Sequence, residues 1–172
     1  MSAEPGLPRP DTNLGTLLAF LIIWFFAWLS GRDRTRTLER EDYTGLNGQT
    51  FEVHVRDVFR TLPGWTADIT QGSHDMGLDV LATAPDGQRW AVQVKHYQTG
   101  APGIAAVQEA YFAQEYHDCH RALVVTSAPR VTPAARKGAQ KVGVRIWTGD
   151  DLREVQRHLL TSDPLPPLLH LS

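Results

Sequence analysis

The sequence predicts an α/β fold in which a mixed β-sheet is flanked by helices and preceded by one apolar helix. Three observations lead to this expectation. Residues 12–31 form an uncharged, largely apolar stretch, and apolar residues recur at helical spacing between 44 and 62. Between 65 and 160, two strand-like runs flank a Pro-Asp-Gly turn and are followed by alternating helical and strand-like runs. A hairpin followed by strand–helix alternation is typical of a mixed sheet with helices on its faces.

Composition limits the class of protein. The 172 residues carry 17 Lys and Arg against 19 Asp and Glu, a formal charge of -2. This balance excludes a protein that binds nucleic acid through overall positive charge, so any such surface must be local. The single cysteine, Cys119, excludes an internal disulfide and a cysteine-rich zinc site, and it fits a reducing compartment.

The apolar stretch predicts a transmembrane helix at residues 14–30, after a short tail at 1–13. Twenty helical residues span roughly 30 Å, the thickness of the hydrocarbon core of a bilayer. One arginine precedes the stretch, whereas Arg32, Arg34, Arg36 and Arg40 follow it within a charged linker at 31–44. Because positive flanks stay inside, we expect a single-pass protein of the inner or plasma membrane whose body is cytoplasmic.

The body is expected at 45–160, followed by a proline-rich, irregular tail at 161–172. Its first helix, from about 46 to 62, has an apolar stripe and ends before Pro63-Gly64. Thr132 and Asp150 are expected to cap two later helices. The remaining elements are predicted in the order strand 65–71, strand 77–84, strand 88–97, helix 104–116, strand 121–126, helix 133–142, strand 144–147 and helix 150–160.

The turn between the second and third strands predicts their register. Pro85-Asp86-Gly87 suits a three-residue loop, with glycine in the left-handed position. Ala84 then pairs with Gln88, and Asp79 lies opposite Gln93. A two-residue loop would instead set Asp79 against an apolar face.

Side-chain alternation favours the three-residue loop. Gln93 and Lys95 share one face of their strand, and Asp79 joins them there. The other face carries Trp90, Val92 and Val94.

This polar patch suggests metal-assisted hydrolysis of a phosphodiester. The carboxylate of Asp79 and the amide oxygen of Gln93 suit Mg²⁺, which takes few protein ligands. Lys95 would orient a water molecule or stabilise charge on a phosphate. Glu52, on the first helix, would contribute another carboxylate to the metal or its water.

The same residues resemble the Mrr-like restriction endonuclease family of the PD-(D/E)xK nuclease superfamily. The resemblance covers roughly residues 45–152 and includes the order of the elements. It is carried by Phe51-Glu52, Gly64, Asp75-Met-Gly-Leu-Asp79, Gln93-Val-Lys95 and Leu123-Val-Val-Thr-Ser127. It implies a restriction-endonuclease-like sheet with core order αβββαβ, and a Mg²⁺-dependent DNA endonuclease of the type IV restriction kind, with Mn²⁺ as a substitute.

The resemblance also implies roles for individual residues. Asp79 matches the metal-binding aspartate, Lys95 the catalytic lysine and Glu52 the acidic residue on the helix. Gln93 stands where most of the superfamily has glutamate and the Mrr-like branch has glutamine. The turn before the aspartate matches at Asp75 and Gly77, and Met76 departs from it, since the family often has a second glycine there.

The partner is expected to be DNA, as duplex, modified or branched DNA. Arg136, Lys137 and Lys141 lie in a locally basic region and are candidate DNA contacts, although solvated helix faces explain them almost equally well. Cutting both strands of a duplex would ordinarily need two sites, so a homodimer is expected. Two alternatives stay open: a noncatalytic nucleic-acid-binding or sensing module on the same fold, and a membrane-tethered interaction protein.

Overall fold

The computed structural model describes residues 14–70 and 77–164. The chain divides into two units, with the boundary between Asp33 and Arg34. Helix α1 (Leu14–Leu38) begins in the first unit and ends in the second. In the first unit, the apolar side chains of residues 18–25 are exposed.

Helix α1 is longer than the apolar stretch that it contains. It continues beyond residue 30 through Arg34 and Arg36, in the charged run for which the sequence predicts a linker, and ends at Leu38. Among the described residues, none of the helices has both the length and the apolar character needed to cross a bilayer. The transmembrane helix expected at 14–30 is therefore not supported.

The second unit contains a five-stranded mixed sheet in the order β1-β2-β3-β4-β5. The first three strands are antiparallel, and β3, β4 and β5 are parallel to one another. This confirms the predicted mixed sheet. The elements are α2 (Gly48–Thr61), β1 (Thr66–Ile69), β2 (Val80–Thr83), β3 (Arg89–Lys95), α3 (Ile104–Tyr116), β4 (Arg121–Thr126), α4 (Pro133–Val142), β5 (Arg145–Trp147) and α5 (Gly149–Thr161).

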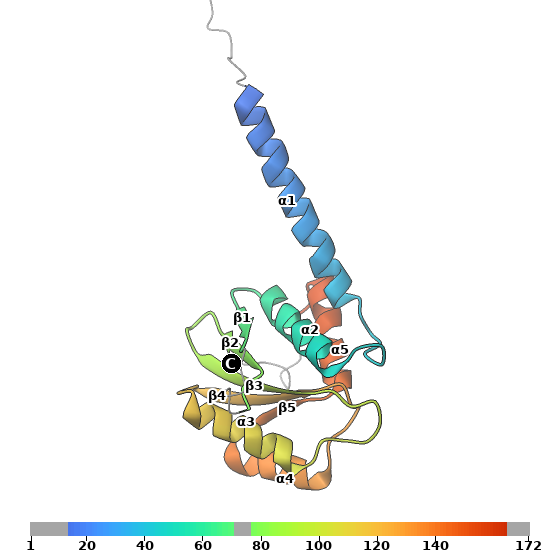
Figure 1. The fold of residues 1–172 in the computed structure, drawn as a ribbon, viewed down its shortest axis with the longest axis vertical. Helices are drawn as coiled ribbons and strands as arrows, with labels where there is room; N and C mark the ends of the chain where they lie inside the picture. Colours follow the sequence, from blue (N-terminus) through green and yellow to red (C-terminus); the bar gives the residue numbers. More distant parts are fainter. Residues whose placement is uncertain (1–13, 71–76, 165–172) are drawn as a thin grey trace, which may run out of the picture. The chain divides into compact units, whose positions relative to one another are not determined.

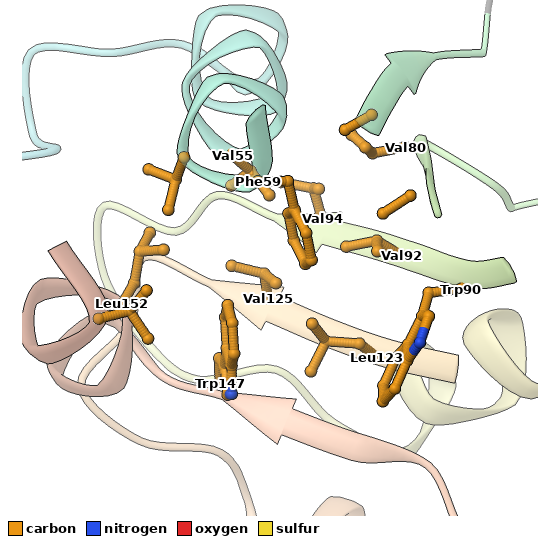
Figure 2. Packing of buried hydrophobic residues seen from close by; sticks show 14 of the residues in the cluster. Val55, Phe59, Val80, Trp90, Val92, Val94, Leu123, Val125, Trp147 and Leu152 are labelled. Atoms are coloured by element: carbon orange, nitrogen blue, oxygen red, sulfur yellow. The ribbon is translucent and has the colours of Figure 1, made fainter. Parts of the chain in front are cut away.

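The sheet lies between two layers of helices. Figure 1 shows α2 and α5 on one face and α3 and α4 on the other. The larger core fills the space between the sheet and the α2–α5 layer, where Phe59 stacks on Trp147 at 5.7 Å (Figure 2). The opposite core is built mainly from alanine and valine, which lets α3 and α4 lie close to the strands.

Side-chain caps fix the starts of α4 and α5. Thr132 caps α4, as expected, and accepts a hydrogen bond from the backbone N–H of Ala135 at 3.2 Å. The prediction of Asp150 as the cap of the last helix is wrong by two residues. Thr148 caps α5, because its hydroxyl and the carboxylate of Asp151 form a reciprocal capping box.

Candidate active site

The hairpin of β2 and β3 has the predicted register. Val80 lies opposite Val92, and the backbone N–H of Ala84 donates to the carbonyl of Gln88 at 2.9 Å. Gly87 has a φ of +85°, the left-handed conformation that the three-residue loop requires. Just before β2, the N–H of Asp79 donates to the carbonyl of Val92 at 3.2 Å, which sets Asp79 beside Gln93.

Alternation along β3 turns Gln93 and Lys95 toward α3. Gln93 is the neighbour of Val124 in the parallel ladder, and Val124 packs in the core beneath α3 and α4. The alternate residues Val92 and Val94 point into the core beneath α2 (Figure 2). Asp79, which precedes the α2-facing Val80, is on the α3 face with Gln93.

The side chains of Asp79 and Gln93 are in direct contact. The amide nitrogen Nε2 of Gln93 donates to Oδ2 of Asp79, and the backbone N–H of Val94 donates to the same oxygen at 2.6 Å. Gln93 is only 3% exposed. Its Oε1 atom is buried and has no hydrogen-bond donor among the described residues. An unsatisfied buried carbonyl oxygen is costly, so this atom is suited to a cation or a water molecule.

Sequence reasoning missed one charged residue of this cluster, Glu109 on α3. Oε2 of Glu109 lies 2.6 Å from Nζ of Lys95. A glutamate on an alanine-rich helix usually faces solvent. The sequence around Glu109 predicts that it lies on a helix, but it does not predict which strand the glutamate contacts. No local signal points to it, because Glu109 shares its helical face with the exposed Phe112 and Tyr116, at i+3 and i+7.

Gly77, in the turn before β2, packs against Gln93 and Glu109. Its φ is +87°, and a Cβ at this position would lie 3.1 Å from Oε1 of Gln93 and 3.4 Å from Cβ of Glu109. A glycine is therefore required both by the backbone and by the space. The other predicted turn residue, Asp75, lies outside the described residues, as does Met76.

Glu52 comes from a different layer of the structure than Asp79, Gln93 and Lys95. It is half-buried in α2, the helix that covers the opposite face from Gln93. The ring of its neighbour Phe51 lies 5.4 Å from that of His96, which follows Lys95. The start of α2 thus reaches the end of β3 where Lys95 is found. The side-chain contacts described above join Asp79 to Gln93 and Lys95 to Glu109.

The oxygen atoms available for a cation come from few residues. Among the described residues, no group of three or more His, Cys, Asp or Glu side chains is arranged to hold a metal ion. The amide of Gln93 meets the carboxylate of Asp79 through Nε2, and its Oε1 is buried without a donor among the described residues. Carboxylate and amide oxygens are the ligand type that Mg²⁺ prefers.

The candidate DNA contacts lie on α4. Arg136, Lys137 and Lys141 are all exposed. Helix α4 covers the same face of the sheet as α3, on which Glu109 faces Lys95. Figure 1 shows α3 and α4 on the same side of the sheet, so the basic residues of α4 are on the side that carries the cluster.

One solved structure with a similar fold is that of a restriction endonuclease. The DNA modification-dependent restriction endonuclease AspBHI is 18% identical, and the match covers 80% of this chain and 37% of that one, with a TM-score of 0.53. The EndoMS-dsDNA2 complex is 22% identical, with 63% of this chain and 48% of that chain covered and a TM-score of 0.43. A repair endonuclease from Pyrococcus abyssi is 18% identical, with 63% of this chain and 49% of that chain covered and a TM-score of 0.45. The chain spans less than half the length of each of these proteins.

The likeness to AspBHI shows a shared fold. The comparison with curated proteins gave no match. The family model Mrr_cat, described as restriction endonuclease, matches residues 44–156, which include the whole cluster described above. Because this match extends over more than half of the sequence, the chain belongs to the Mrr_cat restriction endonuclease family.

Proposed function

We propose that this protein is a metal-dependent DNA endonuclease whose active site is formed by Asp79, Gln93 and Lys95. The observation that carries the proposal is the pairing of Asp79 with a buried Gln93 whose Oε1 atom has no donor among the described residues. Lys95 follows two residues along the same strand and face. Family membership supports DNA as the substrate class.

Asp79 and Gln93 fit a Mg²⁺ ion. The ion takes oxygen ligands and keeps several of its waters, so one carboxylate and one amide oxygen are a sufficient protein contribution. When bound, it would supply positive charge to the phosphate oxygens as negative charge builds on them. Val94 helps from the backbone, because its N–H fixes the position of the Asp79 carboxylate.

Lys95 would act on the phosphate or on the attacking water. In hydrolysis, the oxygen of water forms a bond to phosphorus while the bond from phosphorus to the leaving sugar oxygen breaks. A lysine ammonium can donate hydrogen bonds to the phosphate oxygens and orient the water, but it accepts no proton while charged. The proton of the water then passes to solvent or to a neighbouring carboxylate, for which Glu52 stays the predicted candidate.

The test is plasmid nicking by the full chain. Supercoiled DNA is incubated with Mg²⁺, with Mn²⁺ and with EDTA. We expect conversion to nicked circles only with a metal, and loss of activity of at least about 100-fold in Asp79→Asn and Lys95→Ala. Asp86→Asn is the matched control, because Asp86 is an exposed aspartate of the same hairpin. Equal rates in all four proteins would overturn the proposal.

A noncatalytic DNA-binding module is the second candidate. It is favoured by the neutral Gln93, which leaves the described cluster without a second carboxylate on the strands. This alternative predicts salt-dependent DNA binding by the wild-type chain with no cleavage in either metal.

A further inference from the structure

The ion pair between Lys95 and Glu109 joins the proposed active site to α3. The two charged atoms are 2.6 Å apart, and the side chains of Lys95 and Glu109 are 29% and 44% exposed. Pairs this accessible to water contribute little to folding stability, because solvent screens the charges. Fold stability therefore does not account for the ion pair between Lys95 and Glu109.

The location of Glu109 is more informative than the strength of the pair. A Cβ on Gly77 would touch both Oε1 of Gln93 and Cβ of Glu109, so the helix lies directly against the proposed metal ligands. The tight turn at Gly77 and the small alanines of α3 allow this approach. Glu109 thus comes from a neighbouring layer into the same cluster as Asp79.

Lysine needs such a partner more than most catalytic side chains. Its ammonium stands on a flexible four-carbon stem, and displacement of a catalytic group by about 1 Å can lower a rate about 100-fold. A carboxylate that holds one N–H of the ammonium leaves two N–H groups for the phosphate or the water.

We propose that Glu109 is a positioning residue that holds the ammonium of Lys95 beside Asp79 and Gln93 before DNA arrives. This inference rests on the proposed nuclease function for its catalytic consequence. The positioning itself is a property of the free protein and can be measured without any cleavage.

Labelling of lysine measures the positioning directly. The chain has only two other lysines, Lys137 and Lys141, and both are exposed. The full chain is treated briefly with an amine-acylating reagent, and each lysine is quantified by mass spectrometry. A lysine side chain held in an ion pair is less accessible to the reagent than one that moves freely in solvent. We expect Glu109→Gln to raise the labelling rate of Lys95 several-fold relative to Lys137 and Lys141.

Glu115→Gln is the matched control, because Glu115 is an exposed glutamate of the same helix. It should leave the labelling of Lys95 unchanged. If Glu109→Gln also leaves it unchanged, the proposal is overturned whether or not the protein cleaves DNA.

Cleavage rates measure the catalytic consequence. In single-turnover reactions, we expect Glu109→Gln to slow cleavage about 10- to 100-fold without a change in the Kd for DNA. Glu109→Asp, which keeps the charge, should recover part of the rate. A slower rate with unchanged Lys95 labelling would overturn the proposal.

A wild-type chain that does not cleave at all would instead overturn the proposed function. The labelling result would then still decide whether Glu109 holds Lys95.

Discussion

The hydroxyl of Tyr43 donates a 2.6 Å hydrogen bond to Oε1 of Gln156, although the two residues are 113 positions apart. Gln156 is buried, and its Nε2 donates to the carbonyls of Thr37, Leu38 and Arg40 at 2.9 to 3.0 Å. The side chain of Gln156 therefore satisfies backbone groups at the end of α1 and fixes the segment that leads into α2.

Replacing Gln156 with alanine should destabilise the fold. The variant leaves the buried carbonyl of Leu38, two partly buried carbonyls and the Tyr43 hydroxyl without this partner, which should cost about 2 to 4 kcal/mol. Urea unfolding followed by tryptophan fluorescence measures the decrease in stability. Gln108→Ala is the control, because Gln108 is an exposed glutamine on α3. Equal unfolding midpoints for the two variants would contradict the role given to Gln156.

Stability should also fall in mildly acidic solution, because of His54. This histidine is only 6% exposed, and burial lowers its pKa to about 4, while a contact with Oε1 of Gln156 at 3.4 Å partly opposes the shift. The folded state therefore keeps His54 neutral, whereas the unfolded chain takes up the proton near pH 6.5. Stability is full above pH 6.5 and is lost as the pH falls toward 4, by about 3 kcal/mol.

The measurement is the free energy of unfolding at several pH values between 4 and 7. His54→Asn removes the titrating ring and should flatten the curve in this interval. His120→Asn, at an exposed histidine, should leave the slope as in the wild type. A wild-type curve that is already flat would contradict the buried neutral state of His54.

Local sequence signals are sufficient for the hairpin. The turn at 85–87 predicts the pairing of β2 with β3, and alternation then predicts that Gln93 and Lys95 share a face with Asp79. Both signals act over a few residues, since a turn type fixes a register and a strand has a period of two. This is why the strand part of the candidate site can be predicted from the sequence.

Contacts between distant layers cannot be predicted in the same way. In the sequence, Glu109 and Gln156 are ordinary polar residues of helices. Their contacts with Lys95 and Tyr43 depend on where α3 and α5 pack against the rest of the fold. The end of α1 is equally hard to predict, because the carbonyl groups of Thr37 and Leu38 are satisfied by a side chain more than 100 residues away. No local pattern encodes such a partner.

Replacing Gly77 with alanine should damage the cluster as well as the backbone. An alanine at a positive φ costs about 1 to 2 kcal/mol, and here the new Cβ would also press on Oε1 of Gln93. Gly87→Ala is a close control, because Gly87 has almost the same φ but open space around it. Both variants should lose stability, and only Gly77→Ala should lose metal-dependent cleavage as well. Equal cleavage by the two variants would contradict this packing of Gly77 against Gln93.

Replacing Gln93 with glutamate should make the protein depend on metal for its stability. The amide of Gln93 donates to the carboxylate of Asp79, so a glutamate would bring two negative charges together in a buried place. We expect a lower Tm in EDTA, and a larger rise on addition of Mg²⁺ than the wild type shows. In the control Gln88→Glu, a similar amide–carboxylate contact with Asp86 lies at an exposed turn, so neither effect should appear. A Tm in EDTA equal to that of the wild type would contradict the buried contact.

Charge on α4 should govern the salt dependence of DNA binding. Lys137 and Lys141 are exposed on the side of the sheet that carries the candidate site. Removing one lysine–phosphate interaction should lower the slope of log K against log salt by about 0.9, so the double change to glutamine should reduce it by about 2. Fluorescence anisotropy of a labelled duplex in EDTA measures this slope without cleavage. The control is Arg157→Gln, because Arg157 is exposed on α5, which covers the opposite face. If the α5 variant lowers the slope as much as the α4 variant does, DNA does not bind preferentially to the face on which Asp79 and Gln93 lie.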